Sequence, residues 1–432
     1  MKYLFAFALA GSLLLSSCIE TPNTYSQMPP GTWRGILKLT DPLQAPTPAD
    51  FGEEVKITDY FELPFNMEVA YDAAGKMQVF LINGAEKIPI ENVHYGRDRS
   101  TAKDTLYLGM TAFDTYMDGF YEENTMEGYW HVNYKNNYQI PYIITYGQSH
   151  RFIQDPVANT QDFSGDWKMV FDYDKVPYVG IGEFVQAENE LTGTIRTETG
   201  DYRFLAGNAY GDKLRLSVFD GAHAFLFSGS MDTDTIYGEF RSGKHYLSNW
   251  YAVRDTAFRL QNANEMTKAT QAGPVDFTFK KSDGTAYTLS EKNSEETGIT
   301  IINIMGTWCP NCKDEIAYLK ELKSNPKYED VKVVSLAFER YKDEAKALAM
   351  LGKYREVMDF DWPILLGGYA DKKQNSIDLD FIDELYSYPT MIVLDRNRKI
   401  RKIHTGFSGP ATSKYEEFKK EMATILNKLL AE

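Results

Sequence analysis

Residues 300–315 read TIINIMGTWCPNCKDE, and this stretch decides the fold of the C-terminal third of the chain. The apolar run at 300–305 is typical of a strand, and a glycine follows it. Pro310 suits the first turn of a helix, because that position needs no N–H partner. The pattern therefore places Cys309 at a helix start, where unpaired N–H groups and the helix dipole stabilise a thiolate. Cys312, one turn further on, is within disulfide reach and is expected to face inward.

The chain has only three cysteines in 432 residues, and the third, Cys18, has a separate explanation. Lys2 is followed by an apolar run over residues 4–15, which closes with Leu-Ser-Ser-Cys. This pattern resembles a bacterial lipoprotein signal peptide, in which residues 1–17 are removed and Cys18 is acylated. The run is shorter than the ~20 residues that a membrane-spanning helix needs. An ordinary cleaved signal with an incidental cysteine is the alternative. The mature chain then keeps one cysteine pair in an oxidising compartment.

Three other interpretations of the C-x-x-C pair are weaker. Zinc needs four ligands, and neither a second C-x-x-C nor an H-x₃₋₅-H pattern follows. Covalent haem attachment requires a histidine where Lys313 stands. A purely structural disulfide would close a loop of two residues, which removes little entropy from the unfolded chain. We therefore expect a redox-active disulfide, with no metal and no other cofactor. The histidines are scattered, and none is expected to be a ligand: His94, His131, His150, His223, His245 and His404.

Further segments complete the pattern around the pair. A continuous apolar run at 331–338 is typical of a buried parallel strand, and a proline-containing segment leads into another run at 391–395. Over about residues 270–432 the sequence resembles the TlpA/ResA-like thiol–disulfide oxidoreductases of the thioredoxin superfamily. The matching residues are Trp308, Cys309, Cys312, Glu315 and the segment Tyr388-Pro389-Thr390. The resemblance implies an α/β thioredoxin-like fold for residues 274–432.

The resemblance also implies roles for these residues. Cys309 would be the attacking nucleophile, and Cys312 would be the resolving thiol. Pro389 corresponds to a cis-proline that packs against the disulfide, and the backbone of Tyr388 would offer a strand-like edge to a substrate peptide. The residues placed around a bound substrate are Trp308, Pro310, Tyr388, Pro389 and Thr390.

Glu315 matches the acidic residue that members of the family keep near the cysteines. A buried carboxylate there has a raised pKa and relays a proton to or from Cys312. The alternative is that Glu315 only favours the helix dipole in the first turn. The dipeptide between the cysteines, Pro-Asn, departs from the Gly-Pro of thioredoxin, so the resemblance leaves the reduction potential open.

The region from 31 to about 260 is rich in Tyr, Phe and Thr, with short alternating segments between Gly, Asp and Asn, and is expected to be all-β. It also repeats itself. Three pairs of segments correspond: GTWR at 31–34 with GDWK at 165–168, DTLYL at 104–108 with DKLRL at 212–216, and TMEGYW at 125–130 with TIYGEF at 235–240. This predicts a duplicated unit of about eight strands per copy.

The Gly-x-Trp tripeptide resembles the lipocalin-like calycins. Closed up-and-down barrels and two packed sheets use the same strands, so both remain open. The predicted organisation is a tether at 18–30, one β-barrel-like repeat at 31–152, a second at 163–260, a linker at 261–273 and the thioredoxin-like domain at 274–432. Within that last domain residues 367–385 are an insertion rich in Asp and Lys, which either shapes partner choice or is a solvated excursion, and we expect the latter.

The net charge is −15, from 46 basic and 61 acidic residues, which disfavours nucleic acid as a partner. Membrane attachment must then come from acyl chains on Cys18. No nucleotide-binding motif is present, so electrons must come from an upstream dithiol protein.

The leading hypothesis is a lipid-anchored thiol–disulfide oxidoreductase that faces the periplasm and reduces disulfides of exported proteins. Whether the inner or the outer membrane holds it stays open. One alternative is a peroxiredoxin-like thiol peroxidase, although the usual Pro-x-x-x-Thr-x-x-Cys arrangement is absent. The other is a ligand-binding lipoprotein whose β repeats do the work while the redox domain is accessory.

Overall fold

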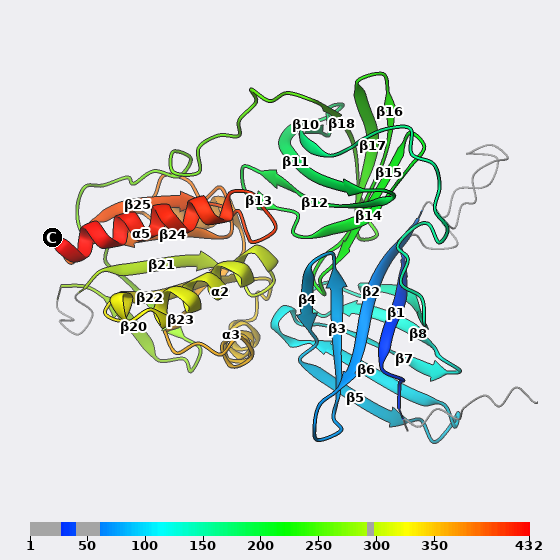
Figure 1. Ribbon diagram of the computed structural model, residues 1–432. Helices are drawn as coiled ribbons and strands as arrows, with labels where there is room; N and C mark the ends of the chain where they lie inside the picture. Colours follow the sequence, from blue (N-terminus) through cyan, green and yellow to red (C-terminus); the bar gives the residue numbers. More distant parts are fainter. Residues whose placement is uncertain (1–26, 40–60, 292–297) are drawn as a thin grey trace, which may run out of the picture.

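The computed structural model describes residues 27–39, 61–291 and 298–432. Two all-β units form the N-terminal part, and an α/β module forms the C-terminal part (Figure 1). This confirms the expected fold class. The predicted signal peptide and the candidate acylation site Cys18 lie outside the described residues. Among the described residues, none of the helices has the length and apolar character needed to cross a bilayer.

The first sheet has nine strands in the order β4-β3-β2-β1-β9-β8-β7-β6-β5. No pairing among the described residues joins its two edge strands, β4 and β5, so this sheet stays open. Its strands are β1 Gly31–Lys38, β2 Glu62–Tyr71, β3 Met77–Asn83, β4 Glu86–Pro89, β5 Asn92–Arg97, β6 Asp104–Met110, β7 Thr115–Glu122, β8 Thr125–Val132 and β9 Gln139–Tyr146, with a 3₁₀ turn, η2, at Thr111–Phe113.

The second sheet closes into a barrel, because β11 pairs with both β10 and β12. Of the two architectures left open, the second copy is thus a closed barrel, whereas the first copy is a single open sheet. The strands are β10 Gly165–Phe171, β11 Tyr178–Ala187, β12 Glu190–Thr197, β13 Gly200–Asp201, β14 Leu205–Tyr210, β15 Lys213–Phe219, β16 Ala224–Asp232, β17 Thr235–Ser242 and β18 Tyr246–Val253.

The two copies share their construction. In each, the first strand pairs with the last, β1 with β9 and β10 with β18. Each first strand carries a buried tryptophan whose indole N–H donates to the carbonyl four residues earlier, Trp33 to Pro29 at 3.2 Å and Trp167 to Phe163 at 2.8 Å. The repeated segments found in the sequence fall on β1 and β10, β6 and β15, and β8 and β17.

The second copy fills the open side of the first. Phe219, at the end of β15, lies in the core of the first sheet, with its ring 4.9 Å from Phe65 and 5.1 Å from Trp130. The side-chain amide of Asn83 donates to the carbonyl of Phe219 at 2.9 Å. Because the first sheet completes its core with residues of the second, the two β units are one packed body.

The C-terminal module has a sheet of seven strands in the order β20-β19-β23-β22-β21-β24-β25. The central strands β21, β22 and β23 are parallel to one another, β24 is antiparallel to β21, and β25 is antiparallel to β24. The elements are β19 Phe277–Lys281, β20 Ala286–Leu289, β21 Thr300–Met305, α2 Pro310–Ser324, η4 Pro326–Tyr328, β22 Lys332–Glu339, α3 Glu344–Met358, β23 Ile364–Tyr369, α4 Lys372–Asp378, β24 Thr390–Leu394, β25 Ile400–Thr405 and α5 Tyr415–Ala431.

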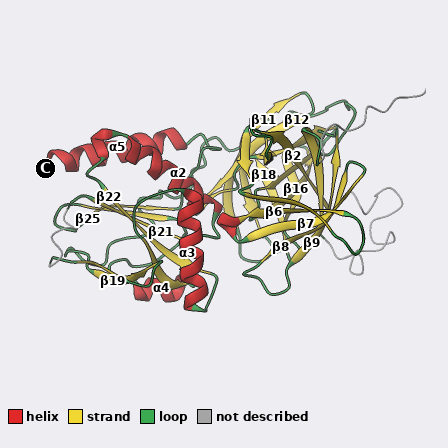
Figure 2. Ribbon diagram, turned by 90° about the horizontal axis from the view of Figure 1, so that it is seen from below, coloured by secondary structure: helices red, strands yellow, loops and turns green. Residues whose placement is uncertain are grey.

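Helices cover both faces of this sheet. On one face α2 packs against α5, where the rings of Tyr318 and Phe418 lie 5.0 Å apart, and α3 lies on the other face (Figure 2). All six residues of β21 are buried, as expected for a central strand of a covered parallel sheet.

The expectation of a solvated insertion at 367–385 was wrong. The segment forms α4 and then buries apolar side chains in the module's core, namely Leu379, Phe381, Ile382 and Leu385. These apolar residues alternate with acidic ones, and the charge obscured the buried face.

Candidate active site

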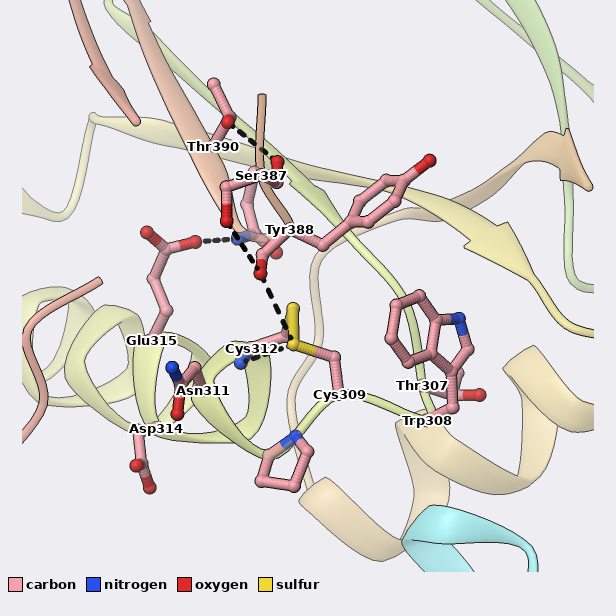
Figure 3. Close-up of a disulfide and its surroundings, with 12 residues drawn as sticks. Thr307, Trp308, Cys309, Asn311, Cys312, Asp314, Glu315, Ser387, Tyr388 and Thr390 are labelled. Atoms are coloured by element: carbon pink, nitrogen blue, oxygen red, sulfur yellow. Dashed lines mark hydrogen bonds between the residues drawn. A yellow bond between two sulfur atoms is a disulfide. The ribbon is translucent and has the colours of Figure 1, made fainter. Parts of the chain in front are cut away.

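The cysteine pair lies between the end of β21 and the first turn of α2. Cys309 is the N-cap of α2, and its Sγ accepts a hydrogen bond from the backbone N–H of Cys312 at 3.3 Å (Figure 3). Pro310 occupies the first helical position. The two sulfur atoms form a disulfide, with the Cα atoms 5.2 Å apart. Cys309 is 6% exposed and Cys312 is fully buried. A second molecule that approached the disulfide would therefore meet the sulfur of Cys309 before that of Cys312.

The segment before β24 lies against the disulfide, as the resemblance implied. The Tyr388–Pro389 peptide is cis, and the carbonyl oxygen of Tyr388 lies 3.6 Å from the Sγ of Cys309. The hydroxyl of Thr390 donates to the carbonyl of Ser387 at 2.9 Å. The rings of Trp308 and Tyr388 meet edge to face at 5.6 Å. The structure therefore brings the residues named from the motif into one site.

Glu315 is fully buried on α2, behind the pair. The side-chain amide of Asn303 donates to its carboxyl, whose other oxygen has no hydrogen-bond partner within the described residues. Burial raises the pKa of Glu315 to about 8, and the Asn303 hydrogen bond opposes this rise. The carboxyl is therefore mostly protonated at neutral pH, and a neutral carboxyl gains little from the helix dipole.

Sequence reasoning missed a second buried acid, Glu339, at the end of β22. Its carboxylate accepts hydrogen bonds from the N–H of Thr307 at 3.0 Å and from the Thr307 hydroxyl at 2.8 Å. Burial raises its pKa to about 7, against these hydrogen bonds. Beside it, the Trp308 indole donates to the carbonyl of Phe338 at 2.9 Å. The sequence signal available for Glu339 was a single acidic residue at the end of an apolar strand.

The sequence also gave no hint that the second barrel contacts the motif. The side-chain amide of Asn311, between the cysteines, donates to the backbone carbonyl of Asp201 at 3.2 Å. Arg203 donates to the carbonyl of Pro310 at 3.1 Å and to the carboxylate of Asp314. The short strand β13 accordingly lies beside the start of α2 in Figure 1.

Arg203 is the centre of a buried charge cluster. Besides Asp314 it pairs with Glu86 of the first sheet and lies 3.5 Å from Asp220. Burial raises the pKa values of Glu86 and Asp314, although Arg203 counteracts the rise in both. Burial also raises the pKa of Asp201 to about 6. The cluster joins both β units to the first turn of α2.

Within the described residues, no group of three or more His, Cys, Asp or Glu side chains is arranged to hold a metal ion.

Comparison with known proteins places the motif in a recognised domain, since residues 268–418 match the Redoxin family. The thiol-disulfide oxidoreductase ResA of Halalkalibacterium halodurans is 28% identical over 176 residues, 41% of this chain and 84% of that protein. The thioredoxin-like protein YneN of Bacillus subtilis is 29% identical over 135 residues, 30% of this chain and 68% of that protein. The thiol:disulfide interchange protein DsbE of Vibrio cholerae is 29% identical over 132 residues, 31% of this chain and 60% of that protein.

Among solved structures, StoA from Bacillus subtilis aligns with a TM-score of 0.25 and 19% identity, covering 35% of this chain and 98% of that one. The thioredoxin domain of a thiol-disulfide oxidoreductase from Bacteroides vulgatus aligns with a TM-score of 0.27 and 17% identity, covering 35% and 96%.

The raised pKa of Glu315 predicts how the oxidised protein responds to pH. Its folded-state pKa of about 8 lies above the ordinary value of 4.5, so its contribution to stability is complete below 4.5 and is lost as the pH rises through 8. Glu315→Gln stays neutral throughout. Between pH 5 and a pH above 8, the free energy of unfolding of the wild type should therefore fall by at least about 1.4 kcal/mol more than that of the variant, which is the value of one pKa unit.

Urea unfolding of both proteins between pH 5 and 9 measures this difference. Glu356→Gln, at an exposed position on α3, is the control and should run parallel to wild type. Parallel curves for wild type and Glu315→Gln would show that the Glu315 carboxyl does not titrate in this range.

Proposed function

We propose, from the Redoxin domain at 268–418 and the disulfide at the start of α2, that this protein is a thiol–disulfide oxidoreductase that reduces protein disulfides. One observation carries the proposal. The Sγ of Cys309 is the N-cap of α2 and accepts the Cys312 N–H, which is the setting that stabilises a cysteine thiolate.

The reaction follows from the different burial of the two sulfurs. In the reduced protein, the Cys309 thiolate attacks one sulfur of a substrate disulfide, that S–S bond breaks, and the other substrate sulfur leaves as a thiolate. The Cys312 thiolate then attacks Cys309 Sγ, which reforms the Cys309–Cys312 disulfide and releases the second substrate thiolate. The substrate gains two electrons and two protons. A dithiol protein returns two electrons to the pair for the next cycle.

Glu315 would handle the proton of the resolving thiol. Cys312 must lose its proton before it attacks, and Cys312 is fully buried on the same helix as Glu315. A carboxyl with a pKa of about 8 exchanges protons near neutral pH, which suits a relay.

The surrounding charges support the reducing direction. A strong oxidant is one whose reduced form is stabilised, as by a cation near the thiolate. Arg203, which bonds the carbonyl of Pro310, is already paired with Glu86 and Asp314. Two further carboxyls, Glu315 and Glu339, lie buried beside the motif. Two cations, Arg340 and Lys372, line the cavity at Cys309. The proposed reducing direction therefore requires that the buried acids outweigh these cations.

The expected location belongs to the same proposal. Acylation of Cys18 would anchor the chain in the cell envelope, facing the periplasm, where exported proteins supply the disulfides.

A clickable palmitate analogue fed to cells should label the wild-type protein, while Cys18→Ala should stay unlabelled. Equal labelling of both proteins would place the acyl chain elsewhere.

The exchange mechanism predicts opposite outcomes for the two cysteines. Cys309→Ser removes the nucleophile, so catalysed reduction of a disulfide-linked peptide should fall by about a thousandfold or more. Cys312→Ser keeps the nucleophile but cannot resolve, so it should accumulate a mixed disulfide with the substrate. Reduction rates and intact-protein mass spectrometry measure these effects.

Cys18→Ala is the matched control, because it removes a cysteine and leaves the pair. It should retain the wild-type rate. Turnover by Cys309→Ser at a rate near that of this control would contradict the assignment of Cys309 as nucleophile.

A further inference from the structure

A cavity of about 480 Å³ lies at the disulfide, between the second barrel and the redox module. Cys309, Trp308 and Tyr388 line it from the module, and Val179, Tyr202 and Phe225 are part of its barrel wall. This volume lies in the range of small-molecule pockets, about 300–1,000 Å³. The barrel therefore forms part of the space through which Cys309 is reached.

Residues 198–201, which comprise the connection after β12 and the short strand β13 and are called the turn below, lie against the edge that would receive a substrate peptide. The hydroxyl of Ser387 donates to the carbonyl of Thr199 at 2.6 Å. Gly200, at φ +148°, is so close to the motif that an added Cβ would lie 2.2 Å from the side-chain nitrogen of Asn311. The positive φ favours glycine here, and a larger residue would also displace the Asn311 side chain. The turn occupies part of the edge beside Tyr388.

This turn is firmly held. The carboxylate of Asp201 accepts a hydrogen bond from the backbone N–H of Gly409 at 2.6 Å, so the module also contacts the turn from a second side. Arg203, two residues further on, is buried and pairs with Glu86 and Asp314. Removing one partner from such a buried ion network is strongly destabilising. The turn is thus a fixed wall of the site in this structure.

The remaining walls favour a slender, partly aromatic guest. Tyr202 and Phe225 pack edge to face at 5.2 Å on the barrel side, and Trp308 faces the cavity from the module. The guanidinium of Arg340, which also lines the cavity, lies 3.9 Å from the centre of the Trp308 ring. Because residues of the barrel and of the module both line the space at Cys309, a compact folded protein would meet the two walls before its disulfide reached the sulfur.

We propose that this composite cavity is the substrate site and that the second barrel restricts it to disulfides carried on an extended peptide segment. The inference rests on the proposed thiol–disulfide exchange and names its substrate class. A single extended strand reaches Cys309 between Trp308 and the barrel wall, whereas a disulfide on a compact folded surface is kept out by the turn at 198–201.

Filling the cavity from the barrel side tests the proposal without touching the redox module. Val179 and Val185 point outward from the same strand, β11, but Val179 lines the cavity whereas Val185 is 66% exposed away from it. In pre-reduced full-length protein, Val179→Trp should slow single-turnover reduction of a disulfide-linked peptide pair by at least about tenfold. Val185→Trp should stay within about twofold of wild type.

Val179→Phe, with a smaller ring, should show an intermediate loss and serves if the tryptophan variant does not fold. The reduction potential of the pair should be equal in all variants, which shows that the chemistry is intact. In the wild type, a stable folded domain with a surface disulfide should react at least about tenfold more slowly than the peptide pair.

The outcomes separate the two proposals. Equal rates for the Val179 and Val185 variants, or equal rates for folded and peptide disulfides, would overturn the substrate inference and leave the exchange function standing. Hydroxyethyl disulfide is the third substrate. If Val179→Trp still reduces hydroxyethyl disulfide but no longer reduces the peptide pair, the result supports exclusion of the peptide by its size. If wild type reduces none of the three, the proposed function itself fails.

Discussion

The hydrogen bond from the Cys312 N–H to the Sγ of Cys309 is the contact on which the site depends. It exists because β21 ends at Met305 and α2 begins at Pro310, leaving Cys309 as the N-cap. A sulfur in that position meets unpaired N–H groups and the positive end of the helix dipole. The same geometry buries the second sulfur, so the proposed roles of attack and resolution fall to two residues one turn apart.

The β region is built into this site. Its second barrel bonds the Pro-Asn dipeptide of the motif through Asp201 and Arg203, and its first sheet supplies Glu86 to the same buried cluster. Burying an arginine among carboxylates is costly unless the groups are paired, so the cluster holds the two parts in one arrangement. The first sheet in turn needs Phe219 of the second copy in its core. The first sheet also contacts the redox module directly, because Glu91 pairs with Lys313 and Asp114 accepts a hydrogen bond from Tyr341.

The local parts of the site were predictable from sequence, and the parts between domains were not. C-x-x-C after an apolar strand and the distant proline each have a local physical signature, as does the Gly-x-Trp that starts each β copy. Barrel closure was not predictable, because open and closed sheets share one alternation of apolar residues. Arg203 and Pro310 are 107 residues apart, and an arginine near a β-turn is ordinary. Glu339 gave only a faint signal, a single acid at the end of an apolar strand.

A redox titration of the full-length protein tests the central claim most directly. Equilibration in thiol–disulfide buffers, followed by trapping of free thiols, gives the midpoint potential of Cys309 and Cys312. The account predicts one two-electron transition at a reducing potential, near the value of about −270 mV that thioredoxin shows. A pair that stays fully oxidised or fully reduced across the range, or that titrates near the value of about −120 mV of a strong oxidant, would contradict it.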